Sequence, residues 1–172
     1  MKNILIIPSF NGNGHIRRMS ILSNFLQKNF KIYLILPLSK NIFPLKKKIT
    51  QIKIKKNFYY SEKKFFEEII NNKKVKKNFK KLNLIISDNN PYFIKLNKKV
   101  IMFSNFLWEK EIKKANNSFY KEIKNRKINI LCNYLFKRPY INQLNYHNIP
   151  FFEKVENKEL KKNSILISIG TA

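Results

Sequence analysis

The sequence predicts an α/β fold built on an open, mostly parallel sheet. Short runs that are apolar on both faces alternate along the chain with amphipathic stretches of helical period, which is typical of a sheet covered by helices on both sides. The first run, Ile4-Leu5-Ile6-Ile7, leads through a turn rich in Asn and Gly into a helix. The 172 residues, 44% of them hydrophobic, suffice for one such domain with a hydrophobic core.

Each element follows from its own pattern. Strands are the apolar or alternating runs, and helices are the stretches where apolar residues recur every three or four positions, as Met19, Leu22, Phe25 and Leu26 do. Ser61 is a candidate N-cap for the second helix. Together these elements predict a Rossmann-like sheet. The predicted strands are residues 2–8, 31–36, 51–54, 82–87, 100–103 and 128–132, and the predicted helices are residues 15–29, 61–81, about 109–126 and 134–145.

The chain is expected to divide near residue 150. Residues 1–150 form the α/β domain, and residues 151–172 combine a polar linker with the first strand of a second domain. That strand, residues 164–169, ends in Gly170 and Thr171, a turn of the kind that follows the first strand of an α/β domain.

The chain is strongly basic, with a formal net charge of +26. A basic balance raises the hypothesis of a nucleic-acid partner. The surplus is almost all lysine, however, and it accompanies abundant Asn and Ile over the whole length, which is typical of a compositional bias on a solvated surface. Nucleic acid is therefore disfavoured as a partner. The lysine-dense face of residues 61–81 is either solvated or a contact to an anionic membrane surface.

The rest of the composition bears on location. Cys132 is the single cysteine, which fits a reducing compartment and leaves no cysteine-based metal site. The sequence shows no signal-peptide pattern and no run near the ~20 apolar residues of a membrane span. We expect a cytoplasmic protein, peripheral at the inner face of the plasma membrane if it meets a membrane at all. His147 and Cys132 have no partners at ligand spacing and are expected to be structural.

The turn after the first strand is the principal candidate site. Asn11, Gly12, Asn13 and Gly14 precede His15 at the expected start of a helix, where unpaired N–H groups attract anions and glycine lets the backbone approach a ligand. These features predict a site for a phosphate or sugar-phosphate at the carboxyl end of the first strand.

Two charged residues extend this candidate site. At about 100° per residue Arg18 falls inside the apolar arc of the helix, where a guanidinium needs a carboxylate or a bound anion, whereas Arg17 faces away. Asp88, the single aspartate of the chain, ends a strand where α/β proteins bind ligands. It either shapes the turn before Pro91 or pairs with Arg18.

Several nucleotide motifs are absent from the sequence. Arg17 stands where the dinucleotide fingerprint needs its third glycine, and no lysine plus Ser or Thr follows the glycines as in a phosphate-binding P-loop. With one aspartate there is no Asp-x-Asp pair to hold a metal-nucleotide. Chemistry on a nucleotide-sugar is therefore expected to need no metal and no cofactor.

The loop Gly12-Asn13-Gly14-His15-Ile16-Arg17-Arg18 resembles the Gly-x-Gly-His-x-x-Arg loop of MurG-like GT-B glycosyltransferases. Three later stretches are similar to the same relatives and fall in the same order. They are residues 86–89 (Ile-Ser-Asp-Asn), residues 106–108 (Phe-Leu-Trp), and residues 165–171 at the start of the second domain.

The resemblance implies a two-domain enzyme whose N-terminal domain holds a hydroxyl acceptor and whose C-terminal domain holds a UDP- or TDP-sugar. His15 falls on the family histidine beside the cleft, Gly12 and Gly14 on the loop glycines that face the acceptor, and Arg18 on the arginine three residues later. Imidazole exchanges protons near neutral pH and suits a general base. Without the resemblance, the favoured interpretation of His15 is a helix-start residue bonded to the backbone.

The other site residues implied by the resemblance have assigned roles too. Asp88 joins His15 as a catalytic residue, and Asn11, Asn13 and Trp108 join the glycines and Arg18 in binding the acceptor or phosphate. Gly170 and Thr171 belong to the donor side.

We therefore expect the acceptor-side half of a hexosyl- or N-acetylhexosaminyltransferase acting on a cell-surface, lipid-linked or natural-product acceptor. No transferase activity is expected from the chain alone, since the donor half is missing from this sequence. Either the sequence is a fragment or a separate donor-domain chain completes it. The strand of residues 164–169 would be left as an unpaired edge with an apolar face, which favours the fragment. Two other functions stay open: a UDP-sugar hydrolase with the same loop, and a non-catalytic basic module that binds nucleic acid or membrane.

Overall fold

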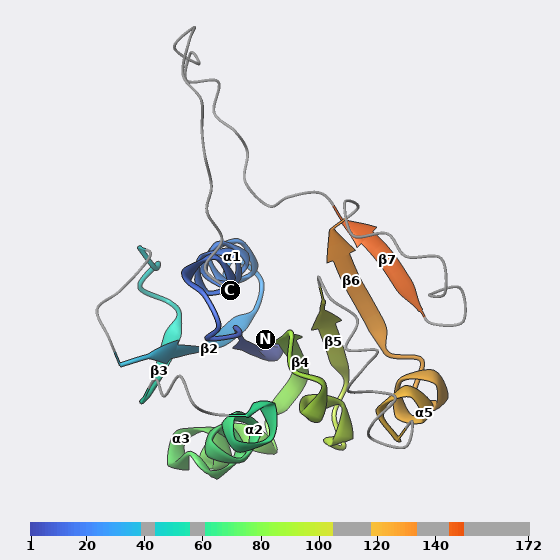
Figure 1. Cartoon of the computed structure of the whole chain (residues 1–172). Coiled ribbons are helices and arrows are strands. Elements are labelled where there is room, and N and C mark those ends of the chain that lie inside the picture. The colour runs from blue at the N-terminus through green and yellow to red at the C-terminus, as the bar shows by residue number, and fades with distance from the viewer. Residues whose placement is uncertain (39–43, 56–60, 105–117, 134–144, 150–172) are drawn as a thin grey trace, which may run out of the picture.

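The computed structural model describes residues 1–38, 44–55, 61–104, 118–133 and 145–149. Within these residues the chain forms a 7-stranded sheet of order β3-β2-β1-β4-β5-β6-β7, and every neighbouring pair of strands is parallel (Figure 1). The predicted α/β, Rossmann-like fold is confirmed. The strands are β1 (Asn3–Ile7), β2 (Lys31–Pro37), β3 (Thr50–Ile54), β4 (Leu82–Asp88), β5 (Val100–Phe103), β6 (Asn129–Asn133) and β7 (Tyr146–Ile149).

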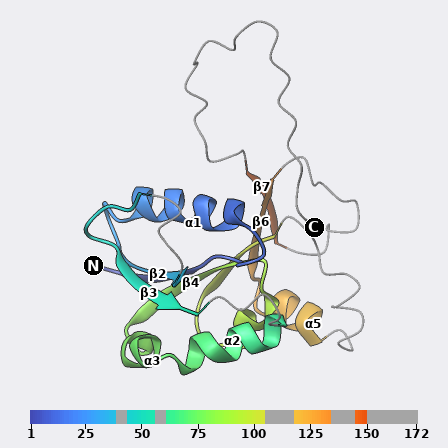
Figure 2. The same ribbon diagram turned by 60° about the vertical axis from the view of Figure 1, so that its left-hand side comes forward.

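Helices cover both faces of the sheet. α1 lies on one face, and α2, α3 and α5 lie on the other (Figures 1 and 2). Among the described helices, none is both long enough and apolar enough to cross a membrane. The helices are α1 (Asn13–Leu26), α2 (Glu62–Asn71), α3 (Lys73–Phe79), the 3-10 helix η1 (Pro91–Lys95) and α5 (Ser118–Asn125).

The central strands are buried on both faces, as their sequences predict. In β1, Ile6 packs in one core cluster with Met19 of α1, whereas its neighbour Ile7 packs in a second cluster with Ile69 of α2. Successive side chains of a strand point to opposite faces, so one apolar run supplies both clusters. This explains the apolar run at the centre of each of these strands.

The first helix differs from its prediction in extent and in its buried face. It begins at Asn13 and not at residue 15, and Phe25, expected in the core, is 68% exposed. The buried stripe instead runs through Ile16, Met19, Ser20 and Ser23, the spacing of one helix face. Serine is tolerated there because the Ser23 hydroxyl donates to the Met19 carbonyl at 2.7 Å.

The single helix predicted over residues 61–81 is wrong, because the chain forms two helices there. Asn72 breaks the run with an extended backbone (φ −62°, ψ 128°), and its side chain accepts hydrogen bonds from the N–H groups of Lys74 and Val75. An Asn side chain that bonds to the backbone competes with helix continuation and starts α3. Ser61 is confirmed as the N-cap of α2, since it accepts from the N–H of Lys64 at 3.3 Å.

Two described elements were not predicted. The 3-10 helix η1 starts at Pro91, whose fixed φ suits a first helical position, and β7 has no apolar run that marks a strand. The predicted helix over residues 134–145 lies outside the described residues except for Asn145, as do residues 105–117 and the predicted second-domain segment 151–172.

The strand order places a topological switch point between β1 and β4. From β1 the chain passes through α1 to β2 and β3 on one side, and then returns to β4 on the other side of β1. In open α/β sheets, ligands bind outside the carboxyl ends of the strands at such a point.

Candidate functional site

Asp88 is the last residue of β4 and lies at the switch point. Ser87, the residue before it, is in register with Ile7 at the end of β1, so the carboxylate follows the carboxyl ends of both strands. The Asp88 side chain is 0% exposed. A buried carboxylate is stable only with charged or hydrogen-bonding partners.

Two partners of Asp88 come from the start of α1. His15 Nδ1 lies 3.0 Å from Asp88 Oδ2, and Arg18 Nη2 donates to Asp88 Oδ1 at 2.6 Å. His15 and Arg18 are three positions apart, which places them on the same face of a helix. These three residues are the switch-point cluster. Of the two partners predicted for Arg18, the structure therefore provides the carboxylate.

The contact with Asp88 links the tautomer of His15 to the charge of the carboxylate. When Asp88 is ionised it only accepts hydrogen bonds, and Nδ1 must then carry the hydrogen of this contact. Arg18 Nη2 also lies 3.1 Å from His15 Nδ1 and donates to the same carboxylate. In the neutral ring the free lone pair is then on Nε2. The His15 side chain is 21% exposed, so the ring is not sealed inside the protein.

Phe103 is a neighbour of the cluster that the sequence analysis did not single out. It ends β5 in register with Asp88, and the guanidinium carbon of Arg18 lies 6.0 Å from its ring centroid. An aromatic face attracts a guanidinium and restricts its position. The signal available in the sequence was an aromatic residue at the carboxyl end of a strand beside the switch point.

Asp88 does not shape the turn before Pro91. That part belongs to Asn90, whose side chain caps η1 by accepting from the N–H of Tyr92 at 3.0 Å. Asn89 takes the left-handed backbone (φ 55°) that ends β4, a conformation that Asn tolerates better than most residues. The Asp88 side chain thus belongs to the cluster, and the next two residues, Asn89 and Asn90, form the turn.

The loop glycines are less constrained than the sequence predicts. No glycine of the described residues has a positive φ, and Gly12 is extended (φ 174°), so the turn does not require glycine's conformational freedom. A Cβ at Gly14 would meet nothing within 4 Å, and one at Gly12 would meet only the His15 ring at 3.9 Å. Open space beside the loop is the property that these positions provide. Asn11 and Asn13 are exposed on the same loop.

Three predicted site residues cannot be placed relative to the cluster. Trp108, Gly170 and Thr171 lie outside the described residues. His147, expected to be structural, lies 3.0 Å through Nε2 from Asn129 Oδ1 and joins β7 to β6.

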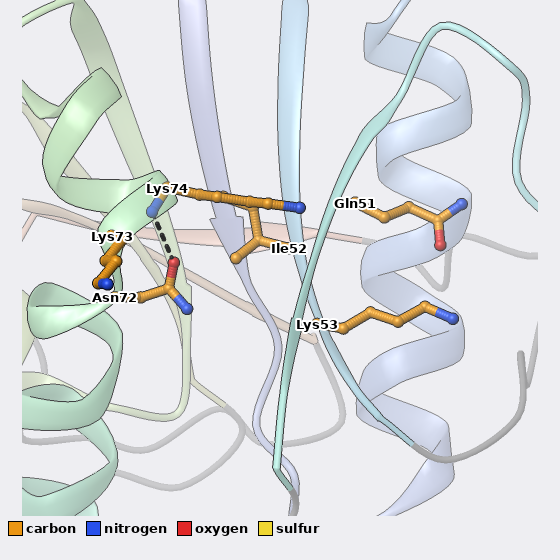
Figure 3. Close-up of a pocket in the computed structure, with 6 residues that line it drawn as sticks. All are labelled: Gln51, Ile52, Lys53, Asn72, Lys73 and Lys74. Atoms are coloured by element: carbon orange, nitrogen blue, oxygen red, sulfur yellow. Dashed lines mark hydrogen bonds between the residues drawn. The ribbon is translucent and has the colours of Figure 1, made fainter.

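A separate groove of about 530 Å³ lies at the β3 edge of the sheet, near the start of α3 (Figure 3). Its lining includes three lysines but no member of the switch-point cluster. Lys53 extends to the side of β3 opposite Asn72, so the lysines do not converge on one point (Figure 3). The groove is lined by Gln51, Ile52, Lys53, Asn72, Lys73 and Lys74.

Comparison with known proteins adds no family assignment. No protein-family model matches the chain, and no curated protein sequence matches it. The resemblance to MurG-like glycosyltransferases therefore rests on the motif residues alone, and the fold and the switch-point cluster stand on the structure.

Proposed function

We propose that the chain is the acceptor-side domain of a metal-independent glycosyltransferase in which His15 is the general base. The observation that carries the proposal is the 3.0 Å contact between His15 Nδ1 and the buried carboxylate of Asp88. A histidine fixed in this way presents its unprotonated Nε2 to a substrate, as a general base must.

The reaction moves one proton and one pair of electrons. The acceptor hydroxyl gives its proton to His15 Nε2 while its oxygen bonds to the anomeric carbon of the sugar. The bond from that carbon to the nucleotide diphosphate breaks, and the electron pair leaves with the diphosphate. Asp88 stabilises the imidazolium that forms. General-base assistance of this kind contributes roughly 10²–10⁴-fold to a rate.

The surroundings of the cluster support binding of an anionic, sugar-containing substrate. The N-cap residue of α1 is Gly12, which provides no capping side chain, so the first-turn N–H groups remain available to a phosphate oxygen. The loop glycines leave space beside His15. The nucleotide-sugar itself is held by a donor domain, either later in the same polypeptide or in a separate chain.

The test uses the protein as it occurs in its own cells. Its intact mass and co-purifying chains are measured first, and the native protein is then incubated with UDP- and TDP-sugars with and without lipid-linked and polysaccharide acceptors. Release of nucleotide diphosphate that requires an acceptor supports the transferase. Release without any acceptor would establish a hydrolase instead. No release from a native protein of this chain's mass with no companion would overturn the proposal.

A further inference from the structure

We infer that Arg18 is a positioning residue that keeps His15 in its neutral, proton-accepting form by serving as the counter-ion of Asp88. The inference rests on the proposed function, because only an unprotonated imidazole can act as a general base. It gives Arg18 a role that does not require contact with substrate.

The first argument is charge compensation. A buried carboxylate with an imidazole as its only partner draws a proton onto the ring, because the resulting ion pair replaces lost hydration. Here Arg18 already lies 2.6 Å from Asp88 Oδ1, while His15 occupies Oδ2. The charge of the carboxylate is thus compensated by a guanidinium that stays protonated at every physiological pH. A second counter-ion, the imidazolium of His15, is therefore not required.

The second argument is the direct contact between the two basic groups. Arg18 Nη2 lies 3.1 Å from His15 Nδ1, so protonation of the ring would place two positive charges side by side. Like charges at this distance disfavour the charged form of a titratable group. The Arg18 side chain is 22% exposed, which weakens the repulsion through solvent but does not remove it.

The other described elements at the switch point add little charge. The strands β1 (Asn3–Ile7) and β5 (Val100–Phe103) contain no ionisable residue, and Arg17 is exposed on α1. α2 brings Glu62, whose backbone carbonyl accepts from the Asn90 side chain at 3.0 Å. Among the described residues, the charged groups in contact with the His15 ring are Asp88 and Arg18.

A role in phosphate binding predicts a different behaviour for Arg18. If Arg18 served only to hold a diphosphate, its loss would raise KM for the donor and leave the charge state of His15 unchanged. If Arg18 acts through Asp88, its loss changes the ring itself, in the absence of any substrate. The two roles are separable by a measurement on the ring.

The experiment measures the 15N NMR signals of His15 in the full chain. The sequence has 2 histidines, so His147→Gln leaves His15 as the single imidazole. We expect the neutral Nδ1–H tautomer near pH 7. In Arg18→Gln the ratio of imidazolium to neutral ring at a fixed pH is expected to rise about tenfold, because the positive charge that disfavours protonation of the ring is gone.

Three further variants make the result specific. Arg18→Lys retains the charge and is expected to restore the neutral ring. Arg17→Gln removes the same charge from the adjacent, exposed position and is expected to change the ratio less than twofold. Arg18→Met keeps the stem beside Phe103 and replaces Arg18→Gln if circular dichroism shows that the latter does not fold.

Several outcomes would overturn the inference. They are an imidazolium or an Nε2–H tautomer in the protein with native Arg18, an unchanged ratio in Arg18→Gln or Arg18→Met, or an equal change in Arg17→Gln. None of these measurements needs a substrate. A protein that shows the expected ring behaviour but no transferase activity would contradict the proposed function alone.

Discussion

Replacement of Asp88 by Asn tests whether the buried carboxylate stabilises the switch point. The change preserves the shape of the side chain but removes the charge that Arg18 meets at 2.6 Å. Removal of one partner from a buried ion pair costs about 3–5 kcal/mol when the other charge is fully buried. Because the Arg18 side chain is 22% exposed and water reaches part of it, we expect a loss of about 2–3 kcal/mol.

The free energy of unfolding is measured by urea titration followed by far-UV circular dichroism on the full chain. A loss of this size corresponds to a melting temperature lower by about 5–10 °C in a domain of this length. Glu67→Gln is the matched control, because Glu67 is an exposed carboxylate of α2. It is expected to stay within about 0.5 kcal/mol of the native protein.

The double variant Asp88→Asn with Arg18→Gln completes a thermodynamic cycle. Once the carboxylate is absent, removal of the guanidinium should cost less than it does in the native protein, with a coupling free energy of about 1–3 kcal/mol. An Asp88→Asn protein as stable as the Glu67→Gln control, or single effects that simply add, would refute the view that Asp88 and Arg18 form a stabilising pair.

Three further predictions concern single contacts. His15→Gln in the native enzyme should lower kcat by roughly 10²–10⁴-fold, and an unchanged single-turnover rate would remove His15 from catalysis. Ser61→Ala should destabilise the protein by about 1 kcal/mol through loss of the α2 N-cap, measured by urea unfolding against an exposed control such as Lys63→Ala; equal midpoints would argue against the cap. Arg126→Gln should cost about 2 kcal/mol, because Nη1 donates to the Ile94 carbonyl and Nη2 donates to the Lys98 carbonyl at 2.5 Å, and an unaltered unfolding curve would show that neither bond contributes.

The central strands and the first turn of the site were predictable because their signals are local. β1, β2, β4 and β5 each contain an uninterrupted apolar run, and such runs are typical of buried parallel strands. The helical spacing placed Arg18 on the inner face of α1 and Arg17 on the outer face, as the structure has them.

The local errors have equally local causes. Phe25 was assigned to the core because it falls at helical spacing with other apolar residues. The buried stripe of α1 instead includes Ser20 and Ser23, and the Ser23 hydroxyl donates to the Met19 carbonyl within the helix. Asn72 ends one helix and starts the next, because its side chain accepts hydrogen bonds from backbone N–H groups. The spacing of apolar residues contains no sign of this break.

Sequence alone determined that this chain is an α/β protein, with a His and an Arg at the start of its first helix and its single Asp at a strand end. It left open whether Asp88 shapes a turn or meets Arg18, since 70 residues separate the two. Only the tertiary structure decided this, because the strand order sets β4 beside β1 and so brings the end of one to the helix that follows the other. Strand order depends on how the whole chain buries its apolar faces, a property of no single segment.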